Sequence, residues 1–259
     1  MAAAHTDGPV AIVTGAGAGI GRATAELFLE RGSNVVAVDA SGDALAWLVD
    51  SPRAISFTAD VSDEAGNAGM VGAALDRWGR VDVMVLNAGI ARRTHWEAED
   101  AVEAYDRIMA VNARGVALGI RHGAPAIADG GGGSIVVVAS TSGVRADPER
   151  FAYNASKAAA INLARAAAID WGHRGVRVNV LAPGPTMTSI LQGGKVTPEH
   201  LDELTRSIPL GRMGTPEEQA EAICFLGSPA ASFITGAVLM CDGGVTAQAG
   251  IFPPPRADA

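Results

Sequence analysis

The chain has 259 residues, of which 48% are hydrophobic and 19% are charged, and its formal net charge is −8. This length favours a single domain over residues 1–259, and the negative charge without a lysine or arginine run argues against nucleic acid as a partner. Two cysteines exclude a disulfide framework, and five histidines without ligand spacing predict no metal. No apolar run approaches the ~20 residues of a membrane helix, and the first residues lack a signal-peptide pattern. We therefore expect a cytoplasmic protein without membrane contact.

Short apolar runs rich in β-branched residues alternate with helical patterns along the chain. Strands are predicted at 10–14, 34–39, 54–58, 82–87, 134–139, 176–181 and 237–241, and helices at 20–31, 41–50, 63–78, 101–123, 153–172 and 216–227. Because strands this apolar are buried on both faces, they indicate a parallel sheet between two layers of helices. Gly32 is expected to end the first helix, and Thr215 with Pro216 to begin the last. An open doubly wound sheet and a barrel of eight βα units both fit this alternation.

A glycine-rich turn follows the first strand, where residues 14–21 read Thr-Gly-Ala-Gly-Ala-Gly-Ile-Gly. Gly15 suits a sharp turn, Gly19 the close approach of a pyrophosphate, and Gly21 tight packing of the next helix, whose N-terminus offers free N–H groups. Ile20 stands where the general G-x-G-x-x-G motif has its last glycine. A flexible surface turn is the alternative. The strand before and the helix after favour a dinucleotide site, and therefore the doubly wound sheet.

Asp39 closes the second predicted strand, where a carboxylate can bind the ribose hydroxyls of adenosine and would repel a 2′-phosphate. Ala18 and Ala40 add no positive charge near it, whereas Arg22 on the first helical turn is a cation that would favour the phosphate. Asp39 therefore predicts NAD rather than NADP. The alternative is a solvated carboxylate in a turn.

Tyr153 and Lys157 stand four residues apart in Tyr-Asn-Ala-Ser-Lys, so they share one face of a long alanine-rich helix. A free phenol ionises at about pH 10, and an adjacent ammonium or the positive ring of an oxidised nicotinamide would lower its pKa. Such a phenol can exchange a proton with a substrate oxygen while the cofactor takes or gives a hydride. A buried tyrosine beside a surface lysine is the alternative.

Residues from about 10 to 246 resemble the short-chain dehydrogenase/reductase family. Seven motifs carry the resemblance: Thr14–Gly21, Asp60-Val61, Asn87-Ala88-Gly89, Asn112 in Val-Asn-Ala, Ser140 at the family's spacing before Tyr153, Pro183-Gly184 with Thr188, and Asp242-Gly243-Gly244. Two positions depart from the family pattern. Leu86 stands where many members have an asparagine, and Thr186 where an aliphatic residue is usual.

The resemblance implies a doubly wound, seven-stranded parallel Rossmann sheet with helices on both faces, and a role for each matched residue. Tyr153 would be the general acid/base, and Ser140 would hydrogen bond to the substrate oxygen. Lys157 would bind the nicotinamide ribose and lower the tyrosine pKa, and Asn112 would hold a water that links Lys157 to solvent. A strand-end serine and an asparagine bonded only to backbone are the alternatives. The cofactor would contact Gly15, Ala18, Gly19, Ile20, Gly21, Asp39, Asp60, Val61, Asn87, Ala88, Gly89, Tyr153, Lys157, Pro183, Gly184, Thr186 and Thr188.

Residues 187–212 resemble the family's substrate-covering segment. Its apolar side chains would either line the substrate pocket or only pack the cover: Met187, Ile190, Leu191, Leu201 and Leu204. Charged residues flank the predicted site at Arg92, Arg93, His95, Arg145, Glu149 and Arg150. An arginine there would bind an acidic group of the substrate, or these charges are simply solvated. Family members commonly form tetramers through helices 101–123 and 153–172 and the last strand, so we expect a homotetramer with an irregular tail around Pro253–Pro255.

The sequence thus predicts an NAD-dependent oxidoreductase that acts on a secondary alcohol or its ketone as a small-molecule substrate. An NADPH-dependent reductase of β-ketoacyl thioesters is the main alternative, and Asp39 argues against it. A dinucleotide-sensing protein without turnover is a remote alternative, because such proteins typically lose the tyrosine or the lysine.

Overall fold

The computed structural model describes residues 8–48, 51–188 and 197–248. Its seven strands form one parallel sheet in the order β3-β2-β1-β4-β5-β6-β7. The strands are β1 (Val10–Thr14), β2 (Asn34–Asp39), β3 (Ala54–Thr58), β4 (Val83–Leu86), β5 (Gly133–Val138), β6 (Val176–Pro183) and β7 (Val238–Cys241). Because β1 pairs with β2 on one side and β4 on the other, the winding reverses between β1 and β4. This confirms the doubly wound sheet, and the two open edges exclude the barrel.

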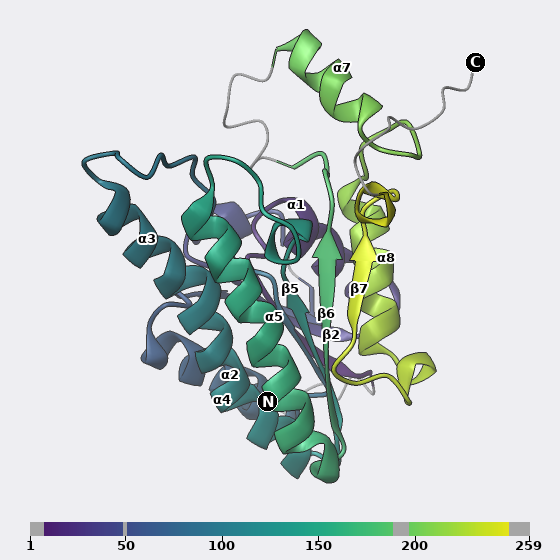
Figure 1. The fold of residues 1–259 in the computed structure, drawn as a ribbon. Coiled ribbons are helices and arrows are strands. Elements are labelled where there is room, and N and C mark those ends of the chain that lie inside the picture. The colour runs from purple at the N-terminus through teal and green to yellow at the C-terminus, as the bar shows by residue number, and fades with distance from the viewer. Residues whose placement is uncertain (1–7, 49–50, 189–196, 249–259) are drawn as a thin grey trace.

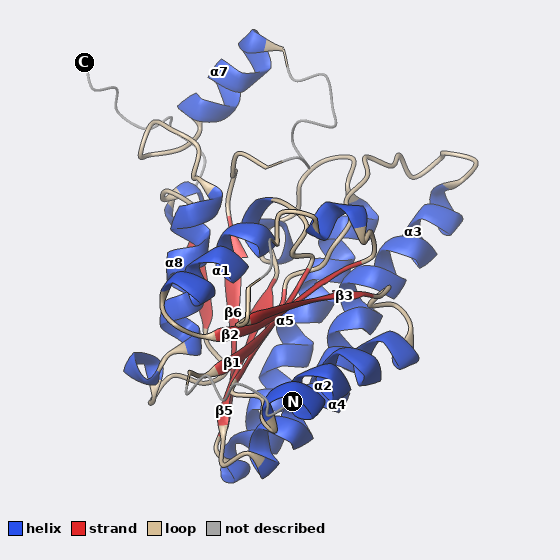
Figure 2. Ribbon diagram, turned by 180° about the vertical axis from the view of Figure 1, so that it is seen from behind, coloured by secondary structure: helices blue, strands red, loops and turns tan. Residues whose placement is uncertain are grey.

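Helices cover both faces of the sheet (Figures 1 and 2). They are α1 (Gly19–Glu30), α2 (Glu64–Trp78), α3 (Ala101–Met109), α4 (Gly115–Asp129), α5 (Phe151–Trp171), α7 (Pro198–Arg206) and α8 (Pro216–Gly227). One layer consists of α1 and α8, whose Phe28 and Ile223 pack with Val13 of the sheet. The other consists of α2, α4 and α5, which cover Ile12 and Met84. Neighbouring strand residues therefore enter opposite cores, as strand geometry requires.

The prediction of a helix at 41–50 is wrong. Over its described part the chain forms only a short 3-10 helix, Asp43–Leu45. Leu45 is buried in the core beside α1, and the indole of Trp47 donates a hydrogen bond to the carbonyl of Ala16 at 3.0 Å. These tertiary contacts hold the segment against the glycine-rich loop and override its helical pattern.

The helix predicted at 101–123 is interrupted. Between α3 and α4 the chain makes a π-helical turn at Ala110–Arg114, and α4 continues to Asp129. A π turn inserts one residue into the helix and is frequent at functional sites. Asn112 lies in this turn and is fully buried.

Within the predicted substrate-covering segment, α7 is a helix that the sequence analysis missed. It lies above the carboxyl ends of the strands, apart from the two helical layers (Figure 1). The signal was present, because Thr197-Pro198-Glu199 repeats the Thr-Pro-Glu pattern that begins at Thr215. At the latter site the prediction is confirmed by a capping box, in which Thr215 and Glu218 bond to each other's main-chain N–H groups.

One further helix-end signal was tested by the structure. Gly32 follows α1 with a φ of +83°, in the left-handed region that glycine adopts without strain.

Among the described residues, no helix is long and apolar enough to cross a membrane. No cluster of three or more metal-binding side chains occurs in that part of the chain either. The predicted tail around Pro253–Pro255 lies outside it.

Candidate active site

The predicted site residues gather along the carboxyl edge of the sheet. Each of the strands β1 to β6 has one predicted segment at its carboxyl end. These segments are Gly15–Gly21 after β1, Asp39 in β2, Asp60-Val61 after β3, Asn87–Gly89 after β4, Ser140 after β5 and Pro183–Thr188 from the end of β6. In open α/β sheets, ligands bind outside these carboxyl ends where the winding reverses. That place lies between β1 and β4.

The glycine-rich loop has no room for a side chain at Gly15 or Gly21. Gly15 and Gly19 have φ values of +67° and +55°. A Cβ on Gly15 would lie 2.9 Å from the Cα of Ala88, and one on Gly21 would lie 2.1 Å from the carbonyl oxygen of Gly15. Because α1 begins at Gly19, the free N–H groups of its first turn belong to this loop. Close backbone approach thus requires glycine at Gly15 and Gly21, and the positive φ requires it at Gly19. Ala18 and Ile20 lie between them.

Asp39 is tied to this loop through a residue that the sequence analysis did not single out. Its Oδ2 accepts a hydrogen bond from the main-chain N–H of Gly17 at 3.0 Å, and its Oδ1 one from Ser41 at 3.0 Å. A Cβ on Gly17 would lie 2.8 Å from the same Oδ2. The carboxylate at the end of β2 is therefore held beside the loop rather than free in a turn.

The Arg22 side chain contacts Glu26 and Trp47 rather than Asp39. Its guanidinium pairs with Glu26 at 2.9 Å and lies 5.2 Å from the ring centroid of Trp47. Both Arg22 and Glu26 are exposed on α1. Arg22, the one cation considered as a possible partner for a 2′-phosphate, is thus already bound to Glu26 and Trp47.

Asp60 and Val61 follow β3. Hydrogen bonds from the main chain and hydroxyl of Ser62, and an ion pair with Arg107 at 3.1 Å, hold the pKa of Asp60 below its usual value. Val61 is buried against Gly115, where a Cβ would lie 3.0 Å from its side chain. Val61 also lines a small cavity together with Thr14 and Ala88, next to the start of the glycine-rich loop.

The segment after β4 is fixed by Thr14 at the end of β1. The Thr14 hydroxyl accepts the N–H groups of Asn87 and Ala88, each at 3.0 Å, and donates to the carbonyl of Val85 at 3.2 Å. The Asn87 side-chain amide donates back to the carbonyl of Thr14 at 2.9 Å. Thr14 therefore joins the two strands at the point where the winding reverses, a role that sequence reasoning did not assign.

Lys157 is a buried cation in α5. Its Nζ donates a hydrogen bond to the carbonyl of Val138 at 2.9 Å and lies 5.7 Å from the centroid of the Tyr153 ring. Burial lowers the pKa of its ammonium to about 8. A Cβ on Gly89 would lie 3.2 Å from this Nζ, so the glycine of Asn-Ala-Gly leaves room for the lysine.

Tyr153 and Ser140 meet at the start of α5. Burial raises the pKa of the Tyr153 phenol, while a hydrogen bond with Ser140 and the charge of Arg150 act in the opposite direction. The tyrosine pKa lowered by Lys157, which the sequence predicted, is therefore not found in the protein alone. The reason is physical: the phenol loses water on burial, and a buried ammonium is itself disfavoured.

Ser140 is oriented by two residues that the sequence analysis left out. Its hydroxyl bonds to the hydroxyl of Ser142 at 3.1 Å, and Ser142 in turn donates to the carboxylate of Asp147 at 2.6 Å. The main-chain N–H of Ser142 also donates to Ser140. The strand-end serine is thus part of a hydrogen-bonded chain and not an isolated hydroxyl.

Both the oxygen and the nitrogen of the Asn112 side-chain amide form hydrogen bonds within the protein. Its Oδ1 accepts the N–H of Ile90 at 2.8 Å, and its Nδ2 donates to the carbonyl of Ile90 and to the hydroxyl of Ser156. A Cβ on Gly89 would lie 3.3 Å from the same Oδ1, so Asn112 and Lys157 approach the Gly89 backbone from two sides. The water that the family resemblance assigns to Asn112 stays a prediction.

The segment after β6 is held against α8 and the residues before it, through a bridge between Thr186 and Gly214. Thr186 is buried, and its hydroxyl donates to the carbonyl of Gly184 at 3.0 Å and accepts from Gln219 at 3.2 Å. Thr188 reaches the glycine-rich loop, since a Cβ on Gly19 would lie 3.4 Å from its methyl group. The unusual Thr186 is therefore explained by Gln219 of α8, which the sequence analysis did not find.

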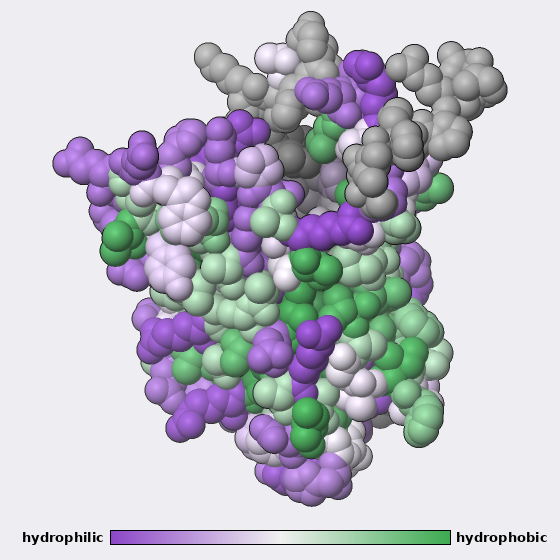
Figure 3. Space-filling model, viewed as in Figure 1, coloured by the Kyte–Doolittle hydropathy of each residue, from purple (hydrophilic) through white to green (hydrophobic). Residues whose placement is uncertain are grey.

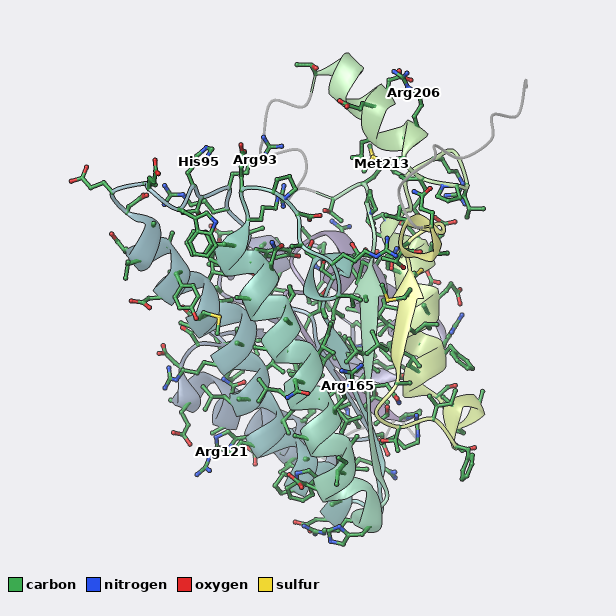
Figure 4. The ribbon with its side chains drawn as sticks, viewed as in Figure 1. Arg93, His95, Arg121, Arg165, Arg206 and Met213 are labelled. Carbon is green, nitrogen blue, oxygen red and sulfur yellow. The ribbon has the colours of Figure 1, made fainter. Side chains whose placement is uncertain are left out.

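The predicted substrate cover contributes an exposed rim. Figure 4 shows Arg206 of this segment on α7. Outside the segment, Arg93 and His95 lie above the start of α5, and the buried Met213 lies at the same edge of the molecule. Met187 and Leu201 are exposed in the described chain, and Leu204 is half-buried. Ile190 and Leu191 lie outside the described residues.

Comparisons with known proteins agree with this geometry. A family model described as enoyl-(acyl carrier protein) reductase matches residues 15–246. The chain is 37% identical to 2-(R)-hydroxypropyl-CoM dehydrogenase of Xanthobacter autotrophicus, over 92% of this chain and 98% of that protein. It is 40% identical to cis-4-hydroxycyclohexanecarboxylate dehydrogenase of Sinomonas cyclohexanicum, over 92% and 96%. A 3-ketoacyl-(acyl-carrier-protein) reductase from Brucella melitensis, solved with NADH, has a TM-score of 0.85 and 36% identity, and the match covers 92% of this chain and 98% of that one.

Proposed function

The chain belongs to the short-chain dehydrogenase/reductase family, and we propose that it is an NAD-dependent dehydrogenase that moves a hydride between the nicotinamide and a secondary alcohol or its ketone. The observation that carries this proposal is the meeting of Ser140, Tyr153 and buried Lys157 at one point of the carboxyl edge. Two relatives named as dehydrogenases of hydroxy compounds support the same reaction class.

The residues present fit a dinucleotide. The side-chain-free cradle at Gly15, Gly19 and Gly21 leaves backbone accessible to a pyrophosphate, and Asp39 lies beside it for a ribose. Asp60, Val61, Asn87, Ala88, Gly89, Pro183, Gly184, Thr186 and Thr188 would complete the cofactor contacts. When bound, the nicotinamide supplies the hydride acceptor for alcohol oxidation and the hydride donor for the reverse reaction.

The protein's own contribution is the movement of one proton. The hydroxyl of Ser140 would hydrogen bond to the substrate oxygen, and the phenol oxygen of Tyr153 would take its proton during oxidation and return it during reduction. The Ser142–Asp147 chain keeps Ser140 oriented. A protonated Lys157 would favour the phenolate and bind the nicotinamide ribose.

Asp39 supports NAD as the cofactor. A 2′-phosphate at the adenosine ribose would lie next to this carboxylate and be repelled by it. Arg22 would not offset the repulsion, because it pairs with Glu26. The same end of β2 would accept a free 2′-hydroxyl as a hydrogen-bond donor.

Assembly as a homotetramer is part of the proposal. The outer side of α5 exposes Ala158, Ala166 and Ile169, and β7 is an open edge of the sheet with Leu239 exposed. Figure 3 shows hydrophobic residues gathered over the region of α5 and β7. We also propose that residues 1–259 form one domain with a core over about 10–246, and that the protein is cytoplasmic.

A reductase of β-ketoacyl thioesters that uses NADPH is the second candidate, favoured by the similarity to the ketoacyl reductase. Asp39 opposes its cofactor. A sensor without turnover is a third and weaker candidate, because Tyr153 and Lys157 are both present.

The experiment that separates these candidates is titration of the protein with NADH and NADPH, followed by nicotinamide fluorescence, and then a rate screen. Tight binding of NADH alone, with NAD reduced in the presence of secondary alcohols, is the expected result. Preference for NADPH with turnover of acyl thioesters would favour the reductase, and binding without turnover would favour the sensor.

A further inference from the structure

Arginines flank the mouth of the proposed active site, and three of the four have partners. Arg92 pairs with Asp100 at 2.5 Å, and Arg93 lies 3.9 Å from Glu149. Arg145 donates to two main-chain carbonyls of the segment after β7, at 2.6 and 2.8 Å. These three guanidinium groups are accounted for by the protein itself.

Arg150 differs from them. Its residue is half-buried, yet among the described residues its side chain makes no ion pair and no hydrogen bond. Its nitrogen donors remain accessible and make no bond within the described residues. A ligand with acceptor oxygens could therefore bond to them.

The backbone at Arg150 is fixed on both sides. Arg150 forms an isolated parallel bridge with Thr94, and the Thr94 N–H donates to the carbonyl of Glu149 at 2.8 Å. The next residue, Phe151, stacks on Trp96 with ring centroids 4.1 Å apart. The side chain therefore starts from a firm position at the rim, three residues before Tyr153.

The charge of Arg150 acts on the Tyr153 phenol and lowers its pKa, while the charge of Asp147 acts in the opposite direction. Both neighbouring acids also contact other groups. Asp147 accepts the Ser142 hydroxyl, and Glu149 faces Arg93 and His95. Within the described residues neither acid forms an ion pair with Arg150, so its guanidinium is left for a ligand.

We propose that Arg150 binds a carboxylate of the substrate, so that the preferred substrate is a hydroxy acid with its secondary alcohol at Tyr153 and its acid group at the rim. The planar fork of a guanidinium matches a carboxylate with two parallel hydrogen bonds. This inference rests on the proposed function and deepens it. A sulfonate or phosphate carries the same charge with other geometry, and the experiment separates these groups.

The first measurement compares kcat and KM for cis-4-hydroxycyclohexanecarboxylate and for its neutral carboxamide, with NAD. The wild-type protein should prefer the acid. Arg150→Gln should lower kcat/KM for the acid by about 10- to 100-fold, mainly through KM, and change the carboxamide by less than about 3-fold. Arg150→Lys should recover part of the loss, and Arg92→Gln should behave as wild type.

The second measurement does not need turnover. Cyclohexanecarboxylate, cyclohexanesulfonate, cyclohexyl phosphate and cyclohexanecarboxamide are titrated against the protein with NADH, and quenching of nicotinamide fluorescence is followed. The carboxylate should bind best, and Arg150→Gln should weaken its binding about 10-fold or more while Arg92→Gln does not.

The outcomes distinguish the two claims. Turnover of the neutral alcohol with no preference for the acid, unchanged in Arg150→Gln, would overturn the role of Arg150 and leave the dehydrogenase in place. Carboxylate binding that depends on Arg150 without turnover of any alcohol would support the anion site and contradict the proposed function. Stronger binding of the sulfonate or phosphate would overturn the choice of carboxylate. A loss for both alcohols with a shifted pH profile would show that Arg150 acts only on Tyr153.

Discussion

The carboxylate of Asp39 and the main-chain N–H of Gly17 are joined by a 3.0 Å hydrogen bond that links the end of β2 to the glycine-rich loop. The bond sets the acid at the place where the adenosine ribose of a dinucleotide would lie. It also explains why Gly17 has no side chain, since a Cβ there would lie 2.8 Å from the carboxylate oxygen.

Asp39→Ser should therefore change the choice of cofactor. Loss of the carboxylate removes both a partner for the ribose hydroxyls and a repulsive charge, so we expect NADH binding to weaken about 10-fold and NADPH binding to strengthen by a similar factor. Fluorescence titration measures both, with the exposed Asp43→Ser as control. Equal binding of the two cofactors by the wild-type protein would contradict this role.

The pKa of Lys157, lowered by burial to about 8, has a consequence for stability. Between about pH 8 and 10.5 the unfolded chain holds this proton and the folded chain does not, so the free energy of unfolding should rise with pH in that window. The full difference is about 3 kcal/mol. Relative to Lys157→Met, the wild-type protein should gain most of this stability from pH 7 to 10 in denaturant titrations. Lys195→Met, which changes the only other lysine, is the control, and parallel pH curves for wild type and Lys157→Met would refute the buried ammonium.

Leu86, which departs from the family pattern, fits against Gly119 of α4. A Cβ at Gly119 would lie 2.4 Å from the Leu86 Cδ2. Gly119→Ala should therefore destabilise the protein by about 1–3 kcal/mol, and a second change, Leu86→Ala, should cancel part of the added loss. Urea unfolding measures the cycle. Gly72→Ala in α2, where no atom lies within 4 Å of a Cβ, should not be destabilising; equal effects at the two glycines would rule out the close contact.

The proposed tetramer depends on the outer side of α5. Ile169 is 81% exposed there, and a carboxylate at this position would be buried without a partner in a helix–helix interface. Ile169→Glu should shift sedimentation velocity from the tetramer to smaller species, whereas Leu75→Glu on the outer surface of α2 should not. A wild-type monomer would contradict the proposal directly.

The sequence predicted the sheet because its strands are apolar, rich in β-branched residues and separated by helical patterns. The predicted site residues followed from their positions at strand ends. Local signals failed where tertiary contacts decide the structure. Trp47 and Leu45 hold a segment that otherwise has a helical pattern, and Asn112 sits in a π turn that no periodicity indicates.

The supporting residues were missed for a similar reason. Thr14, Ser142 and Gln219 have no motif of their own, and their roles exist only because distant segments meet them. The raised pKa of Tyr153 in the protein alone was not predicted, because spacing along a helix gives proximity to a lysine but not the degree of burial.

The proposed mechanism is tested most directly by the rate of NADH formation from NAD and a secondary alcohol. This rate is compared between the wild-type protein and Tyr153→Phe, with Tyr105→Phe as the matched control. Removal of the phenol oxygen should abolish nearly all turnover, at least about 100-fold, while NADH still binds, because the general base is lost and the cofactor cradle is not. Tyr105→Phe should keep wild-type rates. Turnover that survives in Tyr153→Phe would contradict the central claim that this tyrosine exchanges the proton.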